Sequence, residues 1–156
     1  MLILGVKLLH VLSATVYFGA GLVIVHWKVR ADRSQDVSLI TWTHREIIRA
    51  DRLYVVPSII ISPLTGLYLL YTYGLPWTAP WIVAGTAAYL FATGCGLYAT
   101  HLQREMLAVA ERAAAAGRAI PERFHRLTRT WALLGYPAAL ATLFVFWSMV
   151  TKWVPF

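Results

Sequence analysis

Three histidines lie within or at the end of long apolar stretches of the sequence: His10, His26 and His101. Imidazole nitrogens are common axial ligands of haem iron. Ionisable groups at membrane depth usually face a partner, a cavity or a cofactor. His26 and His101 reach nearly the same depth if their helices run in the same direction, so together they could clamp one haem iron. His10 lies 16 residues before His26, or about 24 Å along a helix, so it would need a site of its own.

Each of these histidines also has a purely structural interpretation. His10 could make a hydrogen bond within a helix pair. His26 and His101 could be interfacial residues at helix ends, because basic residues follow each of them. In the haem interpretation, Arg30 or Arg104 would lie near the propionates, and the metal ligands would be drawn from the three histidines.

The composition places these histidines in a membrane protein. The chain has 156 residues, of which 59% are apolar and only 13% charged, and its net charge is +7. Soluble domains are roughly 45–50% apolar and about 25% charged, so a soluble enzyme is excluded. Aromatic residues make up 13% of the chain, which excludes a disordered protein.

The positions of the charges divide the chain. Residues 28–52 and 102–130 hold 12 of the 14 basic residues and all seven acidic ones. The four apolar stretches around them are each long enough to cross a hydrocarbon core of roughly 30 Å as a helix. Barrel strands are not indicated, because the stretches lack alternating hydrophobicity. We predict one all-α domain, an integral membrane four-helix bundle with spans at about 2–27, 53–75, 79–101 and 131–151.

The basic segments also indicate orientation. By the positive-inside rule both face the cytoplasm and both termini lie outside, which predicts a multi-pass protein of the bacterial inner membrane. A cleaved signal peptide does not fit, because the first apolar stretch is too long and no basic region precedes it. Orientation and contact with lipid head groups explain the arginines, so we expect no nucleic-acid partner. His44 and His125 are expected to be solvated, and Trp27 and Trp131 to lie at the inner interface.

The charged segments have helical patterns of their own. Residues 36–52 predict a short amphipathic helix lying on the inner membrane surface. Residues 102–116 predict an extension of the third spanning helix that ends near Gly117. Prolines at 57, 63 and 137 predict kinks in the second and fourth spanning helices.

A stripe of small residues follows the third spanning helix at three- and four-residue spacing. It indicates either close helix contact or a flat face cleared for a cofactor ring. Contact through this face would allow a homo-oligomer or a larger membrane complex. Its members are Gly85, Ala88, Ala92, Gly96 and Ala99.

Four motifs carry a resemblance that spans all four helices. They are HVLSATVYFGAG at 10–21, ADRLYVVPSIIISPLTGLYL at 50–69, LLGYPAAL at 133–140 and MVTKWVP at 149–155. Together they resemble a bacterial integral-membrane family catalogued as domain of unknown function 2269. More distantly, the chain is similar to HemJ-type protoporphyrinogen oxidases and to CopD-like membrane proteins.

The resemblance to HemJ proteins implies haem b bound through the first-helix histidine, here His10. It also makes Lys152 a candidate polar partner, because the terminal Lys-Pro of HemJ proteins is matched loosely by Lys152 and Pro155. The first-helix pattern is matched by His10, Tyr17, Phe18, Gly19 and Ala20. The Asn-Glu-x-Pro sequence of HemJ proteins keeps only Pro137 here, so the resemblance supplies no catalytic glutamate.

The sequence therefore favours a haem b protein of the membrane, working in electron transfer or a HemJ-like oxidation. The alternative is a cofactor-free structural or accessory subunit of a larger respiratory complex. A transporter or copper-handling protein is disfavoured, because the spans contain neither a carboxylate nor a cluster of methionine and histidine.

Overall fold

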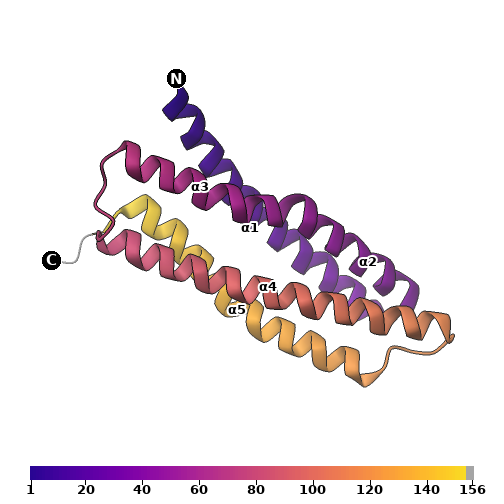
Figure 1. The fold of residues 1–156 in the computed structure, drawn as a ribbon. Coiled ribbons are helices and arrows are strands. Elements are labelled where there is room, and N and C mark those ends of the chain that lie inside the picture. The colour runs from indigo at the N-terminus through magenta and orange to yellow at the C-terminus, as the bar shows by residue number, and fades with distance from the viewer. Residues whose placement is uncertain (154–156) are drawn as a thin grey trace.

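The computed structural model describes residues 1–153, and all regular structure in this range is helical (Figure 1). Four helical runs follow one another along the chain. They are α1 (Leu2–Ser34), the run α2 (Val37–Ala50), η1 (Asp51–Val55) and α3 (Val56–Thr72), then α4 (Pro80–Ala115) and α5 (Glu122–Thr151). Each of the four runs is long and apolar enough to cross a membrane. The prediction of an all-α integral membrane protein with four spanning helices is confirmed.

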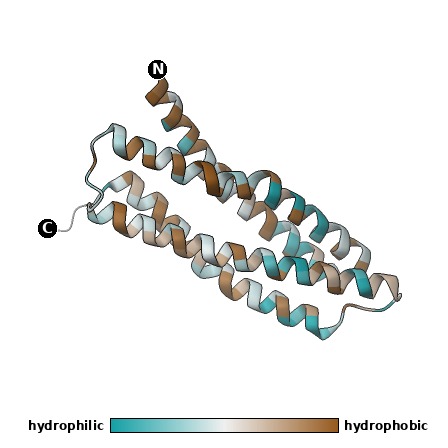
Figure 2. Ribbon diagram, viewed as in Figure 1, coloured by the Kyte–Doolittle hydropathy of each residue, from teal (hydrophilic) through white to brown (hydrophobic). Residues whose placement is uncertain are grey.

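The helices extend beyond the predicted spans at one end of the molecule. α1 continues to Ser34 and α5 already begins at Glu122, seven residues later and nine residues earlier than the predicted spans. The extensions persist because they bury apolar side chains such as Ala31 and Phe124 against neighbouring helices. Figure 2 shows that the hydrophilic residues gather at this end, which we call the polar end. The opposite end, at which α1 begins and α5 ends, is the apolar end.

The prediction that residues 36–52 lie as a separate helix on the membrane surface is wrong. α2 runs through η1 into α3 without interruption and belongs to the bundle (Figure 1). Asp36 caps its start by accepting hydrogen bonds from the backbone amides of Ser38 and Leu39. Ile47 and Ile48 are buried, since the apolar face of α2 packs on α1 and α4 rather than on lipid.

η1 is a single π-helical turn, and Pro57 accounts for its position. Proline has no N–H to donate, and its ring would clash with the carbonyl four residues earlier, here that of Leu53. The wider turn relieves this conflict, because the Val56 amide donates to the carbonyl of Asp51, five residues back. π-turns of this kind occur frequently at functional sites.

The two ends of the bundle are packed differently. α1 packs on α3, and α4 packs on α5. α2 joins these two pairs by contacting both α1 and α4. The main core lies at the polar end, where ten buried side chains meet. They are Ile24, Ala31, Ile40, Ile47, Leu102, Met106, Val109, Ala110, Phe124 and Trp131. A smaller cluster of Leu70, Trp81 and Ile82 lies at the apolar end.

A buried ion pair within α1 lies in the core of the polar end. Lys28 is 1% exposed, and its ammonium donates to a carboxylate oxygen of Asp32, one turn later in α1. The same ammonium lies 3.3 Å from the Thr128 hydroxyl oxygen and 4.9 Å from the centre of the Trp131 ring. The Asp32 carboxylate also lies 3.4 Å from Nε2 of His44. The cluster therefore ties α1 to α2 and α5.

One expectation from the sequence fails at this cluster. His44 was expected to be solvated but is 0% exposed, because α2 packs into the bundle and carries it inside. Trp131, which was predicted to lie at the inner interface, is 8% exposed, because its ring faces the bundle and covers the buried ammonium of Lys28. Trp27, by contrast, is exposed on the outer face of α1.

Asp32→Asn should destabilise the protein strongly, because it leaves the Lys28 ammonium buried without an anion. Loss of one partner of a buried pair costs about 3–5 kcal/mol. The double variant Lys28→Met with Asp32→Asn should recover much of this loss, since no unpaired charge then remains. Thermal unfolding in detergent measures both. Glu46→Gln is the control, because it breaks only the exposed pair between Glu46 and Arg49, worth about 0–1 kcal/mol. Equal losses for Asp32→Asn and Glu46→Gln would contradict the assignment.

Candidate functional site

His10 lies between α1 and α3, beside the proline in the middle of α3. Its Nδ1 is 2.9 Å from the carbonyl oxygen of Ser62 and 3.0 Å from the hydroxyl oxygen of Thr65. A carbonyl oxygen only accepts hydrogen bonds, so Nδ1 carries a proton, and in the neutral ring Nε2 then holds the lone pair. The ring also lies against Gly66, where an added Cβ would come within 3.1 Å of His10 Cε1. The imidazole is thereby held in one orientation and one tautomer.

Tyr89 of α4 binds the same region of α3 from the other helix pair. Pro63 has no N–H, so the carbonyl of Ile59, four residues earlier, lacks its normal helical donor. The Tyr89 hydroxyl donates to that carbonyl at 2.6 Å. Neighbouring helices commonly satisfy backbone groups freed by proline in membrane proteins. The two contacts at Ile59 and Ser62 connect α1, α3 and α4 at membrane depth.

A pocket of about 210 Å³ lies beside the π-turn, between α1, the η1 and α3 segments, and α4. We call it the π-turn pocket. Its walls are mostly apolar, with a tyrosine on one side and ionisable residues on another. The lining residues are Tyr17, Asp51, Val55, Val56, Ile59, Gly96, Leu97, Thr100, His101 and Arg104.

Asp51 is the most unusual residue of the π-turn pocket. It is 6% exposed, and its Oδ2 is buried without a hydrogen-bond partner. Thr100 and Arg104 are its polar neighbours, but the Thr100 hydroxyl donates to the carbonyl of Gly96 at 3.1 Å. A buried carboxylate oxygen without a donor is costly, so a bound group that donates a hydrogen bond would be favoured there.

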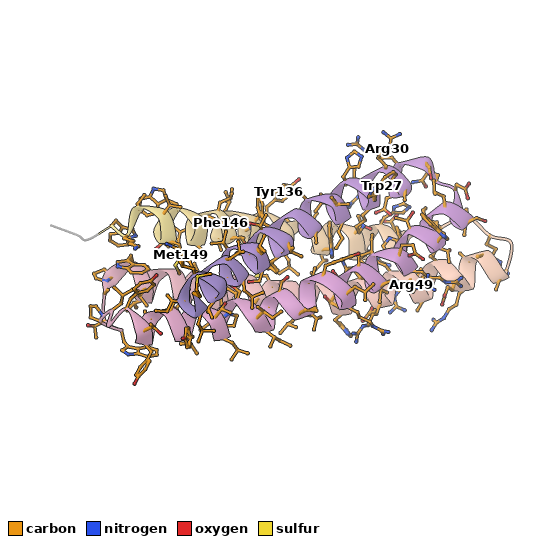
Figure 3. The ribbon with its side chains drawn as sticks, turned by 90° about the horizontal axis from the view of Figure 1, so that it is seen from above. Trp27, Arg30, Arg49, Tyr136, Phe146 and Met149 are labelled. Atoms are coloured by element: carbon orange, nitrogen blue, oxygen red, sulfur yellow. The ribbon has the colours of Figure 1, made fainter. Side chains whose placement is uncertain are left out.

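The other residues predicted from the sequence lie on the surface of the bundle. His26 is exposed, with its ring edge-on to Trp27. His101 is 61% exposed, stacks on Tyr98, and has Nε2 3.0 Å from a carboxylate oxygen of Glu105. Figure 3 shows Arg30 pointing away from the helices. Within residues 1–153, no three or more histidine, cysteine or carboxylate side chains gather in a way that could hold a metal ion.

Lys152 and Arg104 lie at opposite ends of the molecule. Lys152 is exposed and ends α5 in a left-handed conformation, with φ of 45°. Pro155, which the sequence comparison paired with it, lies outside the described residues. Arg104 is exposed at the mouth of the π-turn pocket, where it joins His101 and Asp51. Of the predicted residues, His101 and Arg104 therefore come together at the π-turn pocket.

Sequence reasoning missed Asp51, Tyr17 and Thr100 as pocket residues. Asp51 was counted only as one charge of a charged segment. The signal that could have found it is Pro57, because a proline six residues after a carboxylate inside one helical run disturbs the backbone next to that carboxylate. No such local signal marks Tyr17 or Thr100, whose proximity depends on how α1 and α4 pack.

A family model described as "Predicted integral membrane protein (DUF2269)" matches residues 4–153. The chain belongs to this family. No curated protein and no solved structure matches it. The match covers all four helical runs and every residue of the two sites described above. For this DUF2269 protein, an integral membrane location is thus supported by both the family and the fold.

The small-residue stripe of this DUF2269 protein is used at least partly within the chain. A Cβ on Gly85 would lie 3.4 Å from the Ser148 hydroxyl oxygen of α5. Ser148 in turn donates to the carbonyl of Trp81 at 2.8 Å. Ala92 is buried, and Gly96 faces Tyr17 of α1. The close helix contact indicated by the sequence is present between α4 and α5.

Tyr89→Phe should destabilise the protein by about 1–3 kcal/mol, because it leaves the Ile59 carbonyl without a donor. In a Pro63→Ala background the same change should cost much less, since the new amide at position 63 can donate to Ile59. A double-mutant cycle on unfolding in detergent measures the difference. Tyr68→Phe is the control, because Tyr68 is exposed on the surface of α3. An equal cost of Tyr89→Phe in both backgrounds would contradict this role.

Proposed function

We propose that the protein binds haem b within the membrane, with Nε2 of His10 as an axial ligand, and that it works in electron transfer. One observation supports this above all others. The Nδ1–H of His10 is directed at the carbonyl of Ser62, and metal-ligating histidines almost always donate their second ring nitrogen to such a group. The donation orients the ring and raises the basicity of Nε2, so the residues present fit an axial ligand.

The exposure of His26 and His101 favours His10 over that pair. Nε2 of His101 already contacts the Glu105 carboxylate at 3.0 Å, and this pair lies on the surface, with the His101 side chain 61% exposed. His26 is exposed as well. Arg104 does not serve a haem at His10. Gly96 lies level with Tyr17, so Arg104 is about 15 residues of helix, or roughly 22 Å, from the depth of His10.

Lys152 is the predicted polar partner that lies at the depth of His10. The rings of Phe18 and Phe146 meet at 5.7 Å between centres, and α1 and α5 run in opposite directions (Figure 1). Lys152 is therefore level with about residue 12, roughly 3 Å along the axis from His10. An ammonium at that depth would favour an anionic propionate.

The haem would supply one-electron chemistry, and the chain would supply the ligand, the orientation and the exclusion of water. Thr65 supports the ligand, because its hydroxyl oxygen lies 3.0 Å from His10 Nδ1 while its proton goes to the carbonyl of Ile61 at 2.7 Å. We place the protein in the bacterial inner membrane with both termini outside, as the distribution of basic residues indicates.

The absorbance spectrum of the purified protein tests this proposal. After expression with an adequate haem supply, the wild type should show a Soret band and a sharp reduced α band. His10→Ala should lose most of the bound haem, and added imidazole should restore part of the spectrum if the variant is folded. His125→Ala is the matched control, because His125 lies in the polar end, and it should leave the spectrum unchanged.

Two results would overturn the proposal. A colourless wild-type protein would point instead to a cofactor-free structural or accessory subunit. Full haem content and an unchanged α band in His10→Ala would exclude His10 as the ligand.

Gly66→Ala adds a finer measurement, because its Cβ would press on His10 Cε1 at 3.1 Å. It should shift the α band or the midpoint potential without loss of the haem.

A further inference from the structure

The π-turn pocket has the form of a small amphiphile site. Asp51 lies at the end of the charged segment of the second helical run, followed only by Arg52, whereas Val55 and Ile59 belong to the apolar stretch that comes next. The pocket therefore lies where the polar end meets the membrane-spanning part. Its volume of about 210 Å³ is smaller than the roughly 300–1,000 Å³ of pockets that enclose drug-sized ligands. A single ring fits this volume, with any tail left outside in lipid.

The polar groups of the pocket are separated along α4. The Tyr17 hydroxyl lies next to Gly96, 4.0 Å from the position of an added Cβ. Asp51 lies beside Thr100, one helical turn or about 6 Å further along. Between these levels the walls are Val55, Ile59 and Leu97. A ligand that matches this pattern has a flat apolar body with an oxygen atom at each end.

The unpartnered oxygen of Asp51 decides what one of these ends must be. An ionised carboxylate can accept hydrogen bonds but cannot donate them. Oδ2 of Asp51 receives no hydrogen bond from residues 1–153 of the chain. The ligand must therefore bring a hydroxyl or another donor. At the opposite end Tyr17 can donate or accept, so it suits either a hydroxyl or a carbonyl oxygen.

We propose that the π-turn pocket binds the head group of a membrane-soluble hydroquinone. One ring hydroxyl donates to Oδ2 of Asp51, the ring lies among Val55, Ile59 and Leu97, and the second oxygen meets the hydroxyl of Tyr17. Gly96 makes room for the ring, because it has no side chain on the pocket wall. The site is independent of haem binding, since it uses none of the residues that hold His10.

Binding of a short-chain 1,4-benzoquinol tests the proposal. The full-length protein is purified in quinone-free detergent, and quenching of its tryptophan fluorescence is titrated under anaerobic conditions with the quinol and then with the corresponding quinone. The wild type should bind the quinol about tenfold more tightly, because only the reduced form donates to Asp51, and a hydrogen bond to a charged group is worth about 1.5–3 kcal/mol.

Two variants and a matched control locate the site. Asp51→Asn should abolish or reverse the preference for the quinol, because the new amide can donate a hydrogen bond to a quinone oxygen. Gly96→Leu should weaken binding of both forms at least tenfold, because its side chain fills the space beside Tyr17. Gly94→Leu, on the same helix but open to the surroundings, should bind like the wild type. Size-exclusion profiles establish that each variant is folded.

Three outcomes would overturn the inference. One is equal binding of quinol and quinone by the wild type. Another is unchanged binding in both Asp51→Asn and Gly96→Leu. The third is that the protein binds no quinol in detergent, while in nanodiscs of phosphatidylethanolamine the pocket residues are protected from chemical labelling. That result would assign the pocket to the ammonium group of a lipid. A colourless protein that still binds the quinol would overturn only the haem proposal, and a haem protein that binds no quinol would overturn only this one.

Discussion

The backbone N–H and C=O groups of the second helical run need hydrogen-bond partners within the lipid, and both candidate sites depend on which partners they find. Water cannot hydrogen-bond to a free carbonyl inside the hydrocarbon core, so each group that a proline releases needs another partner. Pro57 is accommodated by the π-turn, which places Asp51 beside a pocket. Pro63 releases Ile59, which Tyr89 satisfies, and His10 binds the neighbouring carbonyl of Ser62. The interruptions in one helix thus attract polar side chains from two others.

The two ends of the bundle are stabilised by different forces. At the polar end, burial of apolar side chains away from water stabilises the fold. Ten such side chains form a core around the Lys28 and Asp32 pair. Within lipid, burial of apolar surface between helices gains little, so helix contact depends on close packing and on hydrogen bonds. There the structure uses the approach of Gly85 to Ser148 and the hydrogen bonds of His10 and Tyr89. The polar end therefore holds the helix pairs together, and the π-turn pocket lies between them next to it.

Charge distribution predicted the spanning helices well, because the cost of burying charge in lipid is large and acts residue by residue. The same reasoning treats every residue of a charged segment as solvated, so it misplaced His44 and did not anticipate the burial of Lys28. A charge can be buried when a partner lies one turn away, as Asp32 does for Lys28. A local sequence pattern also could not predict whether α2 lies in the bundle or on the membrane surface. An amphipathic face predicts burial of Ile47 and Ile48, but only the packing of α1 and α4 decides whether lipid or protein covers them.

One face of α1 connects the separate parts of the molecule. Six residues follow the three- and four-residue spacing of a single helical face, with the step from 17 to 24 spanning two turns. They are His10, Ser13, Tyr17, Ile24, Lys28 and Ala31. Along this face lie the histidine held by α3, the tyrosine of the π-turn pocket, the start of the main core and the buried ion pair. His10 and Tyr17 are two turns apart, or about 10 Å. Because the Lys28 cluster fixes the rotation of α1 at one end and the Ser62 carbonyl fixes it at the other, both candidate sites share one rigid support. A change that rotates α1 at either end should therefore disturb both sites together, whereas a change within the π-turn should affect the pocket alone.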